Sequence, residues 1–194
     1  MANLNPERLK ANLSAMVKSV LEAQNKVGIV SMLNLQADMI ERVFDGGKDV
    51  DGTPIGKYST KPLYVSLKGQ TSQYRSSSLK GKGKYSNSSK FENGNPRKSQ
   101  YFPDGYSGFR AAVGRQNSKV DLRLSGSLLG SIQVGQTQGA ITLGFNNDEQ
   151  FKKAVGNEAR FNKTIFSASE PELKSIEDAW EKASTDAFFS SFDK

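Results

Sequence analysis

Six basic side chains between residues 80 and 98 form the pattern in the sequence that most clearly suggests a binding site. They are Lys80, Lys82, Lys84, Lys90, Arg97 and Lys98, and the aromatic residues Tyr85 and Phe91 lie between them. Cationic side chains interleaved with aromatic rings often hold single-stranded nucleic acid, because phosphates bind the cations and bases stack on the rings. Glycine and serine dilute the charge here, and no named nucleic-acid motif is present. A solvated loop, or a loop docked on an acidic protein, explains the pattern at least as well.

The chain lacks two side chains that are common in catalytic sites, because it contains no histidine and no cysteine. This excludes histidine-based triads, thiolate nucleophiles and the usual zinc sites. The neighbouring carboxylates are Glu170, Glu172, Glu177, Asp178 and Glu181, in the amino-terminal half of a predicted helix, where negative charge is favourable against the helix dipole. A hydrolase that uses carboxylates alone would need a cleft that the sequence does not reveal. We therefore expect no enzyme, no catalytic residue, no metal and no cofactor.

The loop from Asp45 to Tyr58 resembles two familiar ligand loops, and neither spacing fits. Aligning Asp49, Asp51 and Gly52 with a calcium loop places Gly47 at the first ligand position and Tyr58 at the position of the bidentate glutamate. A phosphate-binding nucleotide loop needs four residues between its glycines, and Gly52 to Gly56 has only three. The Asp-Gly and Thr-Pro pairs predict a turn instead.

Charge is distributed very unevenly along the 194 residues, whose formal net charge is +7. The segments 1–56, 57–119 and 120–194 carry net charges of −1, +11 and −3, so the basic character belongs to the middle segment. No stretch approaches the roughly 20 apolar residues of a membrane-spanning helix, and Met1 to Lys10 is charged where a signal peptide would be apolar. We expect one domain over 1–194, with 57–119 as a long basic Ser/Gly/Lys-rich insertion, and no contact with a membrane.

The elements that must position these residues follow from hydrophobic periodicity. Apolar residues at spacings of three and four run from Leu9 to Leu21 and again from Val30 to Phe44, which favours one bent helix over a helical hairpin. Asp45, Gly46 and Gly47 end it. Residues 66–98 have no helical stripe and too little apolar surface to order themselves, so we expect a long loop that is mobile in the free protein.

The last third of the chain predicts several short elements. Alternation over 120–124 indicates a strand, 127–131 a single helical turn, and 132–134 with 140–145 a hairpin closed by the glycine-rich turn 135–139. A short helix over 148–155, a strand over 164–166 and a closing helix that begins near Ser169 complete the pattern. The predicted fold class is α+β, with a long amino-terminal helix packed on a small, mainly antiparallel sheet, a long basic loop insertion and a carboxy-terminal helix.

Two motifs, in this order, resemble a known family. The first is Phe44 followed by Asp51-Gly52-Thr53-Pro54 and 57–61, and the second is 124–132, with the sequence LSGSLLGSI. Both are similar to segments of the tailed-bacteriophage virion-morphogenesis family of tail-completion and head-tail joining proteins. The segment 151–156, Arg160, 165–167 and the helix start at 170–176 also resemble the end of that family's sequences. The chain departs from the family in having Ile55 where tryptophan is usual, no histidine, and a much longer segment over 61–119.

The resemblance implies a structural virion protein that forms a ring of six or twelve copies at the head-tail interface, as a neck, connector or tail-completion protein. It implies portal, adaptor or tail-tube proteins as partners, no small-molecule substrate, a place in the virion, and assembly in the host cytoplasm. Within the second motif it marks a ring interface or a fold element, comprising Ser125, Gly126, Leu128, Ser131 and Ile132. The basic residues with Tyr85 would then contact a partner or packaged DNA in the lumen. The alternative hypothesis is a nucleic-acid-binding protein that acts through 57–119.

Overall fold

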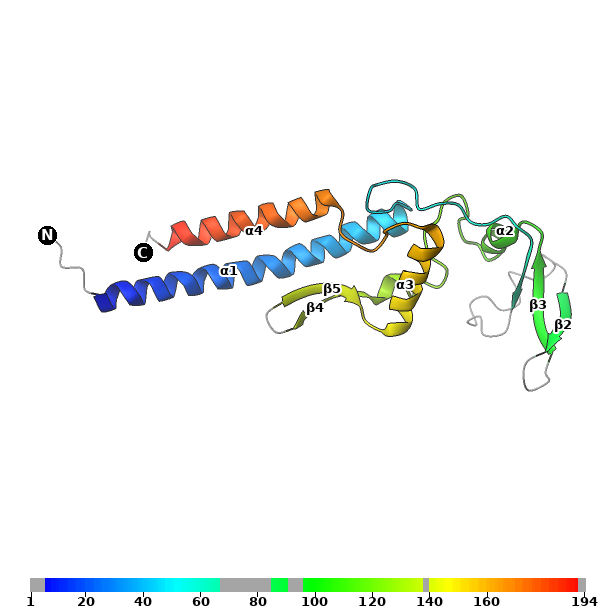
Figure 1. Cartoon of the computed structure of the whole chain (residues 1–194), viewed down its shortest axis with the longest axis horizontal. Coiled ribbons are helices and arrows are strands. Elements are labelled where there is room, and N and C mark those ends of the chain that lie inside the picture. The colour runs from blue at the N-terminus through cyan, green and yellow to red at the C-terminus, as the bar shows by residue number, and fades with distance from the viewer. Residues whose placement is uncertain (1–5, 67–84, 91–95, 138–139, 192–194) are drawn as a thin grey trace. The chain divides into compact units, whose positions relative to one another are not determined.

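A computed structural model of the chain describes residues 6–66, 85–90, 96–137 and 140–191. It divides into two compact units, unit 1 (Met1–Thr53 and Gly126–Lys194) and unit 2 (Pro54–Ser125). The α+β class, with a long first helix, antiparallel strands and a closing helix, is confirmed (Figure 1). The insertion predicted over 57–119 falls inside unit 2, and a single domain over 1–194 stays a prediction.

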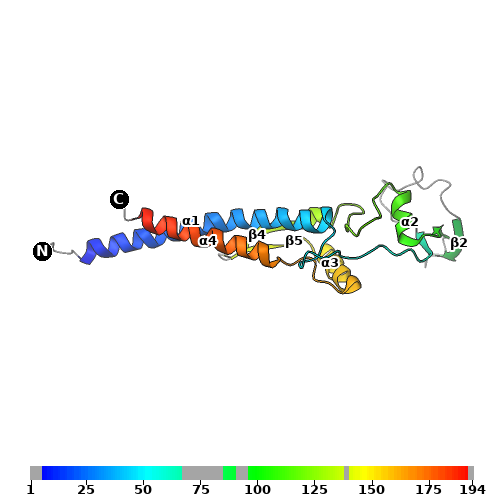
Figure 2. The same ribbon diagram turned by 90° about the horizontal axis from the view of Figure 1, so that it is seen from above.

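Two antiparallel helices form the frame of unit 1. Helix α1 runs without a break over Pro6–Ile40, as one helix rather than a hairpin, and α4 (Glu170–Ser190) lies beside it (Figures 1 and 2). Gln24 on α1 donates a hydrogen bond to Ser184 on α4 at 3.0 Å. After α1 a π-helical turn, η1 (Glu41–Asp45), leads to Gly46 and to Gly47, whose φ of +67° is the left-handed conformation that ends many helices. The predicted end of the first helix is therefore confirmed.

The predicted hairpin packs along α1. Strands β4 (Ile132–Thr137) and β5 (Ala140–Phe145) pair antiparallel, with Ile132 opposite Phe145. Gly28 of α1 is buried where Ile141 and Trp180 converge, because a Cβ at this position would lie 2.6 Å from Ile141 Cδ1 and 3.0 Å from Trp180 Cζ2. The missing side chain at Gly28 thus lets α1, β5 and α4 approach one another closely.

The end of unit 1 is closed by α3 (Asp148–Phe161), which extends six residues beyond the predicted helix. The strand predicted over 164–166 is wrong. The backbone amides of Ile165 and Phe166 donate to Glu158 Oε1 at 2.7 and 3.0 Å, so they are not available for a strand partner. Ile165 is fully buried, and the Phe166 ring packs against Phe145 with 5.4 Å between centroids.

Unit 2 contains a three-stranded antiparallel sheet in the order β1-β3-β2, with β1 over Leu63–Ser66, β2 over Tyr85–Lys90 and β3 over Pro96–Phe102. Helix α2 (Gly105–Ala112) packs on the sheet through Phe109, which meets Phe102 edge to face at 5.5 Å. This part of the predicted loop insertion is therefore folded, because its aromatic residues form a core of their own. The rest of the predicted loop, 67–84 and 91–95, lies outside the described residues.

A glycine fixes the start of α2. Gly105 has a φ of +63°, and a Cβ there would lie 2.6 Å from the backbone oxygen of Ser59. An alanine would therefore combine an unfavourable backbone conformation with a collision against main chain, which moves less easily than a side chain. Gly114, just after the helix, has a similar φ of +73° but open space around its Cβ position.

Candidate functional site

The second family-like motif spans the end of unit 2 and the start of the second segment of unit 1, and three of its nine residues are buried. Gly126 has a φ of +86°, Leu128, Ser131 and Ile132 are buried, and the 3-10 turn η3 (Leu129–Ser131) leads into β4. The Ser131 hydroxyl donates to the Leu128 carbonyl oxygen at 2.7 Å, and the Asn146 amide donates to the Ser131 carbonyl oxygen at 2.8 Å. The helical turn predicted over 127–131 is confirmed at its end. These contacts support the fold-element alternative for Leu128, Ser131 and Ile132, while Ser125 is the last residue of unit 2.

The basic residues singled out in the sequence fall into two groups. Lys80, Lys82 and Lys84 lie outside the described residues. Tyr85 and Lys90 are the ends of β2, and Arg97 and Lys98 lie on β3, where Arg97 is paired with Ser89. The backbone thus brings Lys90, Arg97 and Lys98 onto two adjacent strands, a proximity that the predicted loop did not include.

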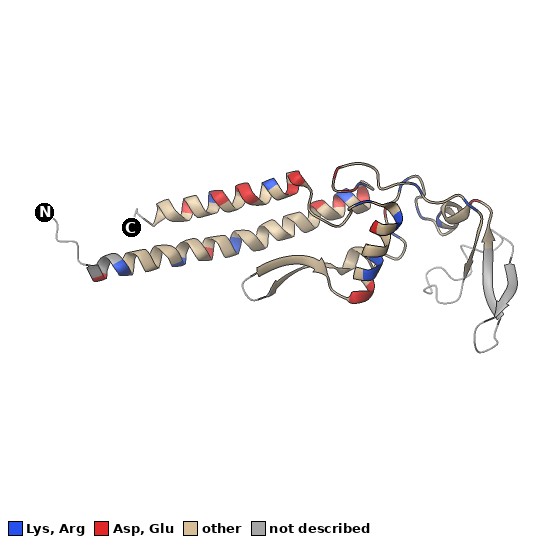
Figure 3. Ribbon diagram, viewed as in Figure 1, with Lys and Arg blue, Asp and Glu red and all other residues tan. Residues whose placement is uncertain are grey.

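The surface of α1 carries two exposed apolar faces, and most of their residues belong to the apolar stripe that predicted this helix. Face A consists of Leu13, Val17 and Leu21, which are 49–59% exposed, and face B consists of Ile29, Val30 and Leu33, which are 39–52% exposed. Face A lies along a groove of about 720 Å³ whose other lining residues include Lys10 and Lys18. An available signal was the uncharged run from Val27 to Ala37, visible as a continuous tan stretch of α1 (Figure 3). This run contains face B but not face A, and it also includes polar residues such as Ser31 and Asn34.

Helix α4 is incompletely covered as well. It has no buried residue, although it carries Leu173, Trp180, Phe188 and Phe189, each at least 38% exposed. Lone exposed apolar residues are normal on a protein surface, whereas repeated ones along two neighbouring helices typically mark a surface that another molecule covers.

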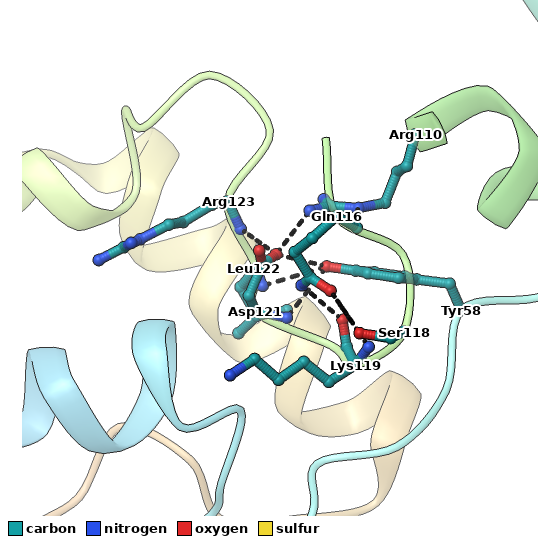
Figure 4. A network of polar contacts seen from close by, with 8 residues as sticks. All are labelled: Tyr58, Arg110, Gln116, Ser118, Lys119, Asp121, Leu122 and Arg123. Carbon is teal, nitrogen blue, oxygen red and sulfur yellow. Dashed lines mark hydrogen bonds and ion pairs between the residues drawn. The ribbon is translucent and has the colours of Figure 1, made fainter. Parts of the chain in front are cut away.

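The strongest polar cluster lies in unit 2 and is centred on a buried ion pair (Figure 4). Arg110 Nη2 is 2.7 Å from Asp121 Oδ1, and both side chains are almost fully buried. Tyr58 donates its hydroxyl proton to the same oxygen at 2.9 Å, and the Arg123 amide donates to it at 3.0 Å. The Arg110 guanidinium also lies 4.3 Å from the centroid of the Tyr58 ring, a cation–π contact.

This cluster explains why the strand predicted over 120–124 is wrong. The Tyr58 hydroxyl oxygen accepts hydrogen bonds from the amides of Asp121 and Leu122 at 3.1 and 3.2 Å. Leu122 has a φ of +51°, which an extended strand cannot contain. The alternation of apolar and charged residues therefore reflects a turn wrapped around a buried tyrosine.

The protonation states in the cluster follow from its contacts. Burial raises the pKa of Asp121, but hydrogen bonds from Gln116, the Arg123 amide and Tyr58, together with the Arg110 charge, hold it below its usual value. Burial and the hydrogen bond to Asp121 raise the pKa of Tyr58 well above its usual range. The carboxylate is thus charged and the phenol neutral near neutral pH. All the groups face one another, so the cluster holds unit 2 together rather than offering a nucleophile to a substrate.

The turn predicted after the first helix is confirmed, and Asp49 forms its centre. Asp49 Oδ1 accepts from the Thr53 amide at 2.8 Å, and Oδ2 accepts from the Thr53 hydroxyl at 2.7 Å. Lys163 Nζ lies 2.5 Å from Asp49 Oδ2. Burial raises the pKa of Asp49, but the hydrogen bonds from Lys163 and Thr53 outweigh it and hold the pKa at about 2. Both carboxylate oxygens therefore have protein partners.

Within the described ranges, no group of three or more acidic residues is placed to hold a metal ion. No described helix combines the length and the apolar character needed to cross a bilayer. Comparison with known proteins found no matching family model, no matching curated protein and no matching solved structure.

Proposed function

We propose that this chain is a structural virion protein whose copies assemble into a ring at the head-tail interface of a tailed phage. The proposal combines the order of the two family-like motifs with one structural observation, the exposure of faces A and B on α1. Neighbours on either side of the ring would be portal, adaptor or tail-tube proteins. The function is assembly and not turnover, with each ring offering a surface for the next.

The positions of faces A and B favour a ring over a two-fold dimer. At about 100° per residue, the centres of the two faces lie roughly 170° apart around α1. Face A also lies nearer the amino terminus than face B. When face A of one copy packs on face B of the next, the contact is heterologous and each copy keeps a free face for another neighbour. Such contacts close into a ring or continue as a filament.

The energy of this contact is small for a single pair. Completing the burial of a half-exposed aliphatic side chain contributes about 1 kcal/mol, so the six residues contribute roughly 6 kcal/mol. Association of two proteins costs about 4–15 kcal/mol in lost freedom of motion. A complex of two copies is therefore weak, whereas a closed ring buries both face A and face B of every copy. We expect monomers at low concentration and closed rings at high concentration or on a partner ring.

Native mass spectrometry across protein concentration, with negative-stain microscopy of the same samples, tests the proposal. Closed assemblies of six or twelve copies are expected. Leu33→Lys should prevent them and leave a folded monomer, because Leu33 is 49% exposed on face B. Ser175→Lys, which adds the same charge at an exposed position on α4, is the matched control and should assemble normally. Failure of the unaltered chain to form closed assemblies, alone or with a head or tail ring, would overturn the proposal.

A further inference from the structure

Two tyrosines, one exposed and one partly buried, form an aromatic pair on the sheet of unit 2. Tyr64 on β1 is the register partner of Tyr101 on β3, and their ring centroids lie 5.0 Å apart at 48°. Tyr64 is 58% exposed, whereas Phe102, Phe109 and Tyr58 in the same unit are buried. Since an aromatic side chain usually contributes most by being buried, the exposed ring of Tyr64, resting against Tyr101, is available to contact another molecule.

Helix α2 covers one face of the sheet at this position. Successive residues of a strand lie on opposite faces of the sheet. Tyr64 and Val65 therefore lie on opposite faces, and so do Tyr101 and Phe102. Val65 and Phe102 belong to the cluster that contains Phe109 of α2. Tyr64 and Tyr101 therefore lie on the face opposite α2.

The charge of unit 2 defines what this face attracts. Residues 54–125 contain fourteen Lys and Arg against three Asp and Glu, a net charge of +11. Arg110 and Asp121 neutralise each other in the buried pair, so the excess belongs to the other residues. Lys57, Lys61 and Arg115 are exposed among those described. A field of this sign favours a polyanion and raises its rate of encounter.

We propose that the face of β1 and β3 carrying Tyr64 and Tyr101 binds single-stranded nucleic acid, with a base stacked on Tyr64 and with the phosphates attracted by the net positive charge of unit 2. The aromatic pair favours nucleic acid over an acidic peptide, because every nucleotide carries a planar base that can stack on a tyrosine ring. In a duplex the faces of the bases are already stacked on one another, whereas a single strand leaves them accessible. The inference concerns unit 2 and does not depend on ring formation.

Fluorescence anisotropy with the full chain and a labelled oligothymidylate of about 15 nucleotides tests this. The affinity should fall steeply between about 50 and 200 mM salt, because counterions are released on binding. Tyr64→Ala should weaken binding by roughly 5- to 150-fold, the effect of losing one stacked base. Tyr64→Phe keeps the ring and should bind within about 2-fold of the unaltered chain. Phe189→Ala, which removes an equally exposed ring from α4 in unit 1, is the matched control and should change nothing.

The remaining outcomes overturn the inference in distinguishable ways. Salt-sensitive binding that Tyr64→Ala leaves unchanged would show that charge alone holds the strand. Equal, Tyr64-dependent binding of polyglutamate would point to an acidic protein as the partner. Absence of oligothymidylate binding at low salt would exclude the site. Hydrogen exchange of unit 2 checks that Tyr64→Ala stays folded. Native mass spectrometry of the same variant should give unchanged assemblies, so failure here leaves the proposed ring function intact.

Discussion

Replacing Asp121 with alanine removes the central acceptor of the buried cluster in unit 2. Three donors lose their partner oxygen, namely Arg110 Nη2, the Tyr58 hydroxyl and the Arg123 amide. The guanidinium of Arg110 has a side chain only 1% exposed and remains charged without its carboxylate. Removing one partner of such a buried pair costs about 3–5 kcal/mol, because the other charge is left in a medium of low polarity.

The size of unit 2 makes this loss decisive. At about 0.05–0.15 kcal/mol per residue, its 72 residues provide roughly 4–11 kcal/mol of stability if the unit unfolds by itself. Each kcal/mol shifts the melting temperature of a domain of this size by about 4–8 °C. We therefore expect Asp121→Ala to lower the melting temperature of unit 2 by at least about 12 °C.

Hydrogen exchange followed by mass spectrometry separates the two units within one experiment. Peptides from β1, β3 and α2 should lose protection in Asp121→Ala, while peptides from α1 and α4 keep theirs. The only tryptophan, Trp180, lies in unit 1, so its fluorescence reports unit 1 separately. Asp104→Ala is the matched control, because Asp104 is exposed and its side chain makes no capping hydrogen bond at the start of α2.

A double variant tests the assigned cause. Arg110→Met with Asp121→Asn removes both charges and keeps an acceptor for Tyr58 and the Arg123 amide. It should regain at least half of the stability lost in Asp121→Ala, because no unpaired charge is then buried. An unpaired buried charge is not the cause if Asp121→Ala destabilises unit 2 no more than Asp104→Ala does. The same holds if the double variant is less stable than Asp121→Ala.

Three further predictions concern single positions. The pKa of Asp49 is lowered from 3.8 to about 2, so its contribution of about 2 kcal/mol should be complete above pH 4 and disappear as the pH falls towards 2. In an acid titration, Lys163→Met should show a smaller component, because of the groups that lower this pKa only Thr53 remains. Gly105→Ala should destabilise unit 2 by more than the roughly 1–2 kcal/mol expected at Gly114→Ala, since both share a positive φ and only Gly105 meets the backbone; urea melts compare them. Ile132→Lys should unfold unit 1 instead of yielding a folded monomer that cannot assemble, because Ile132 is 3% exposed; circular dichroism distinguishes these results.

Elements defined by contacts between near neighbours could be predicted from the sequence. The end of the first helix at Gly46 and Gly47, the closing helix after Ser169 and the hairpin over 132–145 depend on caps, turns and periodicity within a few residues. Unlike the ion pair with Lys163, the hydrogen bonds between Asp49 and Thr53 in the predicted turn are local in the same sense. Such interactions need no knowledge of distant chain, so the local pattern determines them.

The tertiary structure decided what depends on partners far away in the chain. Residues 120–124 alternate like a strand, but the hydroxyl of Tyr58, more than sixty residues earlier, accepts hydrogen bonds from the amides of Asp121 and Leu122. The pairing of Tyr64 with Tyr101 likewise depends on the β1–β3 register, which no local pattern specifies. The sequence alone determined that positive charge concentrates in the middle of the chain. Only the packing decided which aromatic residues lie in the core of unit 2 and which stay exposed, because burial depends on the neighbours that folding supplies.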